Sequence, residues 1–432
     1  MRGVTDEVSG AGARMHDLVR RMYPICRSIT GSGVRQTLDI IGEHLPLQRV
    51  EVPSGTQAHD WTVSDEWNEA DAYIADKDGR RLVDFREHNL HLVGYSVPVR
   101  ATMTLAELRP HLHTHEAHPD WIPYRTTYYH RDWGFCLSQR QLDALGEGPF
   151  EVVVDTTLQP GSLSYAELLV PGEVEDELLL SAHICHPSMA NDNLSGIAVS
   201  VELAQALLRR QDRRLSYRFL FSPGTIGSIV WLSEHAVGLP NIRHGLVLTG
   251  LGGPGPLVYK RTRHGRRPID RAAAHVVSRL DGDVRDYSPY GYDERQFNAI
   301  GFDLPVGRLS RTPHGEYPEY HTSADDLDFV RAEQLADSLG ALLRILEAVE
   351  HDAVYRNLSP YGEPQLGRRK LYPTMGGRAA SDEVMAMLWT LAYSDGSTSL
   401  LDIAERGEVD FTQLRAAATK LAEADLLERV EL

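Results

Sequence analysis

An apolar strand, a polar loop and an amphipathic helix follow one another near the middle of the chain. The run Leu178–Leu180 is typical of a buried parallel strand, and apolar residues recur at helical spacing over residues 197–208. The loop between them carries His183, His186 and Asp192. Because open α/β sheets bind ligands at the carboxyl ends of their strands, we expect a ligand site here. Two imidazoles and a carboxylate are suitable donors for zinc or a similar divalent ion.

The bulk composition excludes several classes of protein. A length of 432 residues favours about two or three domains, and the chain has no apolar run long enough to cross a membrane. Its three cysteines cannot build a disulfide framework, and the N-terminus has no apolar signal core, so we expect a cytoplasmic location. A net charge of −17 argues against a general binder of nucleic-acid backbones.

Strands and helices alternate from Phe150 to about Ala353, which predicts helices over a mixed, mostly parallel sheet. We assign this core to residues 1–49 and 149–355. The expected strands are Glu151–Asp155, Glu177–Ala182, Tyr217–Ser222 and Gly245–Thr249. The expected helices are Ile197–Arg210, Ile226–His235, Pro268–Leu280 and Arg331–Glu350.

Residues 50–148 differ in character from this core. Aromatic residues occur there in short alternating pieces that prolines interrupt, which predicts a small β-rich insert domain. Its aromatic side chains are expected mainly in the core of the insert, although Tyr128, Tyr129 and Trp133 could line a substrate cleft. The insert could also supply the surface of a homo-oligomer.

Residues 378–432 have the layout of a winged helix-turn-helix domain. Three short helical patterns, Asp382–Tyr393, Ser399–Arg406 and Phe411–Ala424, precede a strand-like tail. This segment contains five Arg or Lys residues and eleven Asp or Glu residues. DNA binding needs a basic recognition helix, so we interpret the domain as a packing or interaction module and disfavour a transcription regulator.

Two later segments could complete the site. Asp293 and Glu294 lie in one of them, and the other contains Glu319, His321 and Asp325. Both follow expected strand ends and could converge on the loop that carries the first three candidates. A carboxylate has two oxygens, so an aspartate at the centre could bridge two metal ions.

The order of these pieces resembles the zinc exopeptidase superfamily that contains bacterial leucyl aminopeptidases and glutaminyl cyclases. The shared pieces are a strand that ends in His, then Asn-Asp-Asn-x-Ser-Gly, Asp-x-x-x-Phe and Tyr-His-Thr-x-x-Asp. Nearly the whole chain is similar to a closer family of bacterial aminopeptidase-like proteins with a β-rich insert and a C-terminal winged helix. Phrases such as Ile-Cys-His-Pro-Ser carry this closer resemblance.

Carried over by position, the resemblance implies one zinc ion held by His183, Asp192 and Asp293. It implies a second ion held by Asp192 and His321, with Asp325 fixing the turn that carries His321. One ion or two are both compatible with the sequence.

Two departures from the superfamily affect the expected chemistry. Cys185 replaces the aspartate that orients the first histidine there, so His186 rivals His183 as the ligand. The superfamily also carries a Glu-Glu pair after the next strand, and this chain has no carboxylate there. Glu294, Glu316 and Glu319 are nearby candidate substitutes for the general base, and we select Glu294 and Glu319.

The resemblance implies a zinc-dependent, aminopeptidase-like hydrolase. Such an enzyme would cleave an amide near a free amine in a small peptide or an aminoacylated metabolite. The missing glutamate pair keeps an alternative open, a catalytically degenerate scaffold or binding protein that contains metal.

Overall fold

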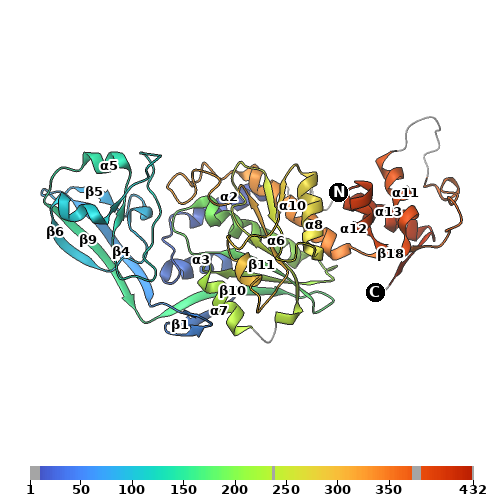
Figure 1. Ribbon diagram of the computed structural model, residues 1–432, viewed down its shortest axis with the longest axis horizontal. Helices are drawn as coiled ribbons and strands as arrows, with labels where there is room; N and C mark the ends of the chain where they lie inside the picture. The colour runs from blue at the N-terminus through green and yellow to red at the C-terminus, as the bar shows by residue number, and fades with distance from the viewer. Residues whose placement is uncertain (1–9, 236–238, 372–380, 431–432) are drawn as a thin grey trace.

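The computed structural model describes residues 10–235, 239–371 and 381–430. Three bodies lie in a row along its longest axis (Figure 1). A β-rich insert occupies one end, a large α/β core the middle, and a helical module with a small sheet the other end. Within these ranges, no helix has both the length and the apolar character needed to span a membrane.

The core is built on an eight-stranded sheet with the order β1-β10-β12-β11-β13-β16-β14-β15. The pairs β12/β11, β11/β13, β13/β16 and β14/β15 are parallel, whereas β1/β10, β10/β12 and β14/β16 are antiparallel. The strands are β1 (Gln48–Pro53), β10 (Ser162–Val170), β11 (Glu177–His183), β12 (Ser216–Ser222), β13 (Ile242–Leu248), β14 (Leu257–Lys260), β15 (Asp283–Arg285) and β16 (Val306–Arg311). The mixed, mostly parallel sheet expected from the sequence is confirmed.

Strand β11 is buried at all seven positions, as a strand covered on both faces must be. Leu178 and Leu180 face one hydrophobic cluster and Leu179 faces another, since successive side chains point to opposite faces.

The first of these clusters lies beneath a group of mutually packed helices. They are α2 (Ala11–Met22), α6 (Gly196–Arg209), α8 (Pro268–Arg279) and α10 (Ala332–His351). Helices α3 (Ser32–Gly42), α7 (Ile226–Glu234) and α9 (Glu294–Phe297) complete the core.

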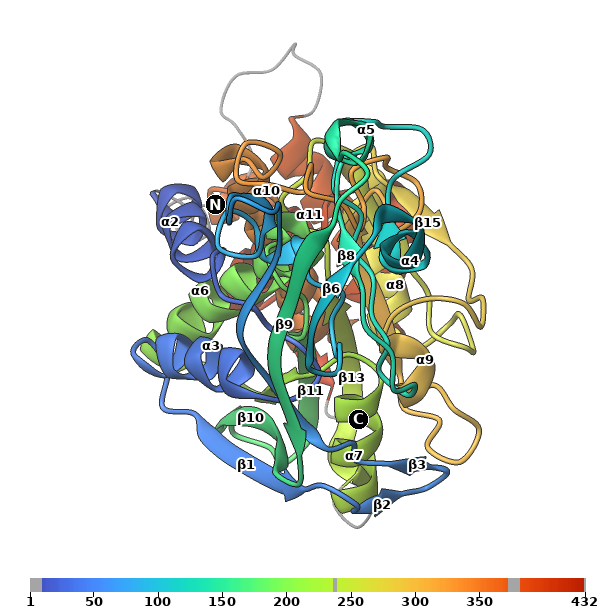
Figure 2. The same cartoon turned by 90° about the vertical axis from the view of Figure 1, so that its left-hand side faces the viewer.

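The insert contains a four-stranded sheet with the order β5-β4-β9-β6. Figure 2 looks at this end of the molecule and shows β9 running down toward β10 and β1. The strands are β4 (Glu66–Ala75), β5 (Arg81–Asp84), β6 (Val99–Met103) and β9 (Phe150–Gln159). Shorter elements are β2 (Gln57–Ala58), β3 (Trp61–Thr62), α4 (Leu105–Leu108), β7 (Leu112–His113), β8 (Phe135–Cys136) and α5 (Gln139–Ala144).

Strand β9 corrects one sequence-based expectation. The strand expected at Glu151–Asp155 was placed in the core, but it pairs with β4 and β6 in the sheet of the insert. Its alternating burial suits a sheet with one face on the insert core and the other in water. Conversely, β1 lies mostly beyond position 49 and still belongs to the core sheet.

The C-terminal winged helix expected from the sequence is confirmed. Its helices are α11 (Asp382–Tyr393), α12 (Leu400–Gly407) and α13 (Phe411–Glu423), and its strands are β17 (Val354–Asn357), β18 (Asp395–Ser399) and β19 (Leu427–Val430). The domain begins earlier than the expected position 378. Strand β17 follows α10 directly and forms the centre of the domain's small sheet. The module and the core helices share one continuous hydrophobic cluster.

Candidate metal centre

The loop after β11 begins the site at the carboxyl edge of the parallel strands. His183 is the last residue of β11 and is 2% exposed. Its ring stacks on Tyr292, with 5.2 Å between the centroids. The parallel neighbours β12 and β13 end beside it, so the loops that follow all three strands meet at one edge of the sheet.

The Asn-Asp-Asn segment is held in place by backbone hydrogen bonds. The amides of Asn191 and Asp192 donate to the two carboxylate oxygens of Asp325, at 2.5 and 2.9 Å. The side chain of Asn191 accepts from the amides of Gly252 and Gly253. These contacts leave the carboxylate of Asp192 free to face the histidines. The Asp325 carboxylate holds the loop of Asp192, and the amide of Asp325 donates to the carbonyl of Thr322, next to His321, at 3.1 Å.

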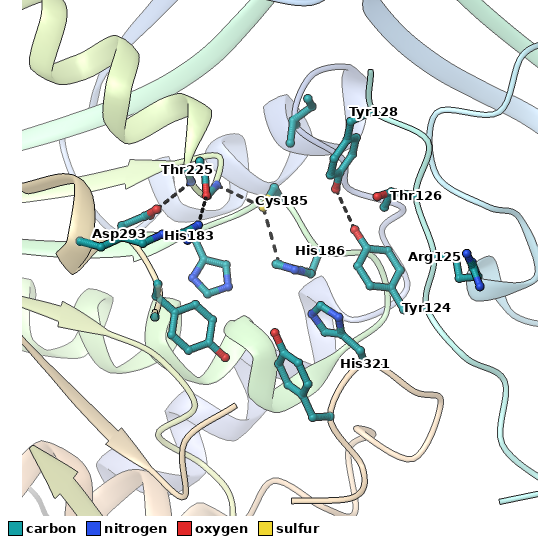
Figure 3. Close-up of a pocket in the computed structure, with 16 residues that line it drawn as sticks. Tyr124, Arg125, Thr126, Tyr128, His183, Cys185, His186, Thr225, Asp293 and His321 are labelled. Carbon is teal, nitrogen blue, oxygen red and sulfur yellow. Dashed lines mark hydrogen bonds between the residues drawn. The ribbon is translucent and has the colours of Figure 1, made fainter. Parts of the chain in front are cut away.

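The carboxylate of Asp192 is fully buried, and three imidazoles surround it. Figure 3 shows these three, His183, His186 and His321, facing one another. His183 Nε2 lies 2.9 Å from Oδ1, and His321 Nε2 lies 3.1 Å from Oδ2. His186 Nε2 lies 3.9 Å from the same Oδ2. The two histidines that compete in the sequence therefore approach different oxygens of one carboxylate.

Burial and mutual interaction set the charges at this centre. Burial lowers the pKa of His186 to about 3, so its imidazole is neutral and able to ligate without losing a proton. Burial alone would raise the pKa of Asp192, but the three surrounding imidazoles bring it well below its usual value. Burial raises the pKa of Asp325 to about 8, against the opposing effect of the amides that donate to it.

Cys185 contacts the His186 ring on its Nδ1 side. Its Sγ lies 3.6 Å from His186 Nδ1 and accepts a hydrogen bond from the amide of Gly224 at 3.2 Å. Burial raises the pKa of the Cys185 thiol to about 12, so the sulfur is not a thiolate ligand. A proton on Nδ1 donated to the sulfur leaves Nε2 free for a metal.

Asp293 reaches the same cavity from the start of α9. Its Oδ1 accepts from the amide of Thr225 at 2.7 Å, whereas its Oδ2 is buried with no hydrogen-bond partner. Burial raises the pKa of this carboxyl group above its usual value. Thr225 has φ 62°, an unusual conformation for a β-branched residue and one that is strained. Gly224 and Thr225 follow β12 and line the cavity.

The structure does not bring Glu294 or Glu319 into the cavity. Glu294 is fully buried and pairs with Lys260, whose Nζ lies 2.9 Å from Oε1. The backbone carbonyl of Glu319 accepts from the Thr322 hydroxyl at 2.8 Å, and its side chain does not line the cavity. Neither glutamate is therefore placed as a general base.

The cavity beside the centre has a volume of about 300 Å³ and includes a wall from the insert. Tyr124, Arg125, Thr126 and Tyr128 line this wall. The amide of Tyr124 donates to the carbonyl of His321 at 2.8 Å, and the Tyr124 ring lies 5.0 Å from the His321 ring. Of the tyrosines expected at a cleft, Tyr128 lines the cavity, and sequence reasoning missed its neighbour Tyr124.

The donor set fits a zinc ion. Neutral imidazoles and carboxylates are zinc ligands, and ligand atoms of His183, His186 and Asp192 all lie within 4.8 Å of one another. The buried Oδ2 of Asp293 has no hydrogen-bond partner, although buried polar atoms nearly always have one, and a cation beside it would satisfy this oxygen. His321 joins this set through the shared carboxylate.

Comparison with known proteins agrees with this geometry. Residues 16–352 match the family described as the domain of unknown function DUF4910, and residues 353–429 match a winged helix-turn-helix family. The chain is 47% identical over 427 residues, 98% of each chain, to a Clostridium acetobutylicum protein named as a candidate polysaccharide biosynthesis protein with an aminopeptidase-like domain.

Two solved structures are similar in fold. The crystal structure of a candidate peptidase from Clostridium acetobutylicum has a TM-score of 0.93 and 45% identity, and the match covers 100% of each chain. A zinc aminopeptidase from Bacillus subtilis has a TM-score of 0.56 and 14% identity over 79% of this chain and 94% of its own. The second likeness shows the fold, and together they confirm the resemblance to aminopeptidase-like proteins.

Proposed function

The chain belongs to the DUF4910 family, and from this premise we propose that it is a zinc-dependent hydrolase of the aminopeptidase type. The arrangement of Asp192 carries the proposal. One of its oxygens faces His183 and the other faces His321, at the edge of the sheet and beside a cavity. The proposed reaction is cleavage of an amide near a free amine, in a small peptide or an aminoacylated metabolite.

The proposed ligands divide into two sets around the bridging carboxylate of Asp192. His183 and Asp293 would hold one ion on the Oδ1 side. His186 and His321 would hold the second ion on the Oδ2 side, because both approach that oxygen. His186 would thus supply the ligand that the superfamily takes from a glutamate.

Zinc would supply the electrophilic chemistry by polarising the scissile carbonyl and acidifying a water molecule. The chain itself holds the ligands and shapes the space around the substrate. Asp325 fixes the loop of Asp192, and Tyr124 docks the insert against the segment that carries His321. The insert wall would cover a bound substrate and exclude water from the cavity.

The relative from Clostridium acetobutylicum points to a class of substrate. Its name connects it with polysaccharide biosynthesis and with an aminopeptidase-like domain. An amide on a modified sugar would suit both descriptions, so we add aminoacylated sugars to the proposed substrates.

We propose that the winged helix packs and interacts with protein rather than with DNA. Both basic residues of α13 are paired with carboxylates of the same chain. Arg415 pairs with Glu347 of α10, with 2.9 Å between Nη1 and Oε1, and Lys420 pairs with Glu383 of α11. A cytoplasmic location and a homo-oligomer are further parts of the proposal.

A catalytically degenerate scaffold is the second candidate, and the residues that line the cavity favour it. No glutamate lines the described part of the cavity. Gly224 and Thr225 line it instead, and they follow β12, the strand after which the superfamily carries its glutamate pair. Such a protein would bind zinc and hydrolyse nothing.

Amine release from a panel of aminoacyl amides and aminoacylated amino sugars tests the proposal. The zinc-loaded wild type should release amine, and Asp192→Asn should reduce the rate by about 100-fold or more because removing a bridging ligand disrupts the site. Asp326→Asn, the same change at a carboxylate that accepts from the amides of Asp328 and Phe329, is the matched control.

Activity that survives in Asp192→Asn at the wild-type rate would contradict the hydrolase mechanism. Zinc binding with no turnover of any substrate in the panel would favour the scaffold instead.

A further inference from the structure

A cation with no acidic partner lines the proposed metal cavity. Arg295 lies on α9, two residues after Asp293, and is half-buried. Its Nε is buried with no hydrogen-bond partner, and one Nη lies 3.4 Å from the Thr225 hydroxyl. Within the described ranges it forms no ion pair with a carboxylate. An unpaired, partly buried guanidinium is costly, and an anion in the cavity would offset this cost.

The surroundings of Arg295 cannot neutralise its charge. Lys260 and Arg308 are both buried and share one carboxylate, that of Glu294, at 2.9 and 3.6 Å. Burial lowers the pKa of Lys260, and repulsion by Arg308 and Arg295 lowers it further against the attraction of Glu294. The carboxylate of Glu294 therefore already faces two other cations and does not pair with Arg295.

Further positive charge lies on the opposite wall. Arg125 of the insert lines the same cavity, next to Tyr124 in sequence, and is exposed (Figure 3). Within the described residues it also forms no ion pair. Asp293 lines the cavity and Asp192 contacts its histidines, and both carboxylates are assigned to the proposed zinc ions. The whole chain has a net charge of −17, so the positive charge of Arg295 and Arg125 at the cavity is a local feature. Such a local positive charge attracts anions.

We propose that the substrate carries an oxyanion, a carboxylate or a phosphate, that pairs with Arg295 while Arg125 attracts it from the insert side. A guanidinium matches both groups because its planar N–H donors can form two parallel hydrogen bonds to them. This inference rests on the proposed function for the use of the cavity as the substrate site. It narrows the substrates to amides with an acidic group.

Calorimetric titration of the full chain with small anions tests the inference. The zinc-loaded protein is titrated with inorganic phosphate, succinate and the neutral succinamide at constant ionic strength, because the argument assumes that zinc neutralises Asp192 and Asp293. An anion that binds to zinc alone would bind equally well to Arg295→Gln. The wild type should bind at least one anion and not succinamide. Arg295→Gln should weaken that binding about tenfold or more, and Arg125→Gln should weaken it less, because that side chain is exposed.

Two further variants keep the test interpretable. Arg295→Lys retains the charge but not the planar donors, so its affinity should fall between those of the wild type and Arg295→Gln. Arg209→Gln removes an exposed charge at the end of α6 and should bind like the wild type. The thermal unfolding midpoint of each variant checks that it is folded.

Tighter binding of phosphate or of succinate would show which oxyanion the site prefers, and either preference supports the inference. Binding of both anions by Arg295→Gln at wild-type affinity would overturn it. So would a wild type that binds neither anion better than succinamide. Since hydrolysis is not measured, the inference and the proposed function can fail independently.

Discussion

The central residue of the site is Asp192, because its two oxygens separate the histidines into two groups. The sequence alone leaves His183 and His186 as rivals, since they lie three residues apart on one loop. In the folded chain, His183 approaches Oδ1, whereas His186 approaches Oδ2 together with His321. We therefore assign His183 to the proposed ion on the Oδ1 side and His186 to the proposed ion on the Oδ2 side.

Replacing each histidine separately should therefore remove different ions. We expect His183→Ala and His186→Ala each to hold about one zinc ion fewer than the wild type, because each would lose one ligand of one set. Elemental analysis after zinc loading and removal of free metal measures this difference. His44→Ala, which alters an exposed histidine of the core, is the control. Loss of zinc in only one of the two variants would contradict the two-set arrangement.

Some features of this site could be predicted from the sequence, and others could not. His183, Asp192 and His321 could be predicted to converge because they lie near the ends of neighbouring strands or in loops beside them. The pairing of Glu294 with Lys260 could not, because it depends on how α9 packs against β14. The strained backbone of Thr225 likewise has no signal in the residue type, since threonine rarely adopts a positive φ.

At the scale of elements, the attachment of the insert to the core decides the shape of the cavity. An isolated bridge pairs Pro123 of the insert with Thr322, next to His321. The hydroxyl of Ser323 accepts from the amide of Ile122 at 3.0 Å. These contacts place Tyr124 on the cavity wall. The sequence predicts that the insert exists but not which of its segments touches the core, because that contact involves backbone groups far apart in the chain.

A salt bridge between α3 and β4 contributes to this attachment. Arg35 donates to both carboxylate oxygens of Glu66, which also accepts from the amide of Ser162 at 3.1 Å. The hydrogen bonds from Arg35 lower the pKa of Glu66 to about 2. Because the folded-state pKa lies below the unfolded one, this pair stabilises the fold fully above about pH 4.5 and loses its effect as the pH falls toward about 2.

Glu66→Gln should consequently lower the thermal unfolding midpoint near neutral pH. The difference from the wild type should shrink as the pH falls from about 4.5 toward about 2, because the wild-type carboxylate becomes protonated there. Calorimetric or dichroism melts over this pH range measure it, with the exposed Asp78→Asn as the control. A difference that stays constant across the whole range would argue that the charge of Glu66 does not stabilise the fold.

At the scale of the whole molecule, a superfamily-like core carries two additions with separate roles. The insert closes one side of the cavity, and the winged helix continues the hydrophobic core of the helical layer. The sequence predicts all three parts, because a strand-helix alternation, an aromatic-rich segment and a short helical repeat differ in pattern. Their contacts depend on complementary surfaces, which residue patterns do not encode.

We propose that one buried carboxylate, that of Asp192, organises a zinc centre at the edge of the sheet. Elemental analysis of the wild type and of Asp192→Ala, each purified without chelator, loaded with zinc and freed of excess metal, tests it most directly. We predict about two zinc ions per wild-type chain and nearly complete loss in the variant, since both sets share Asp192. A wild type that holds no zinc, or a variant that holds as much as the wild type, would contradict the claim.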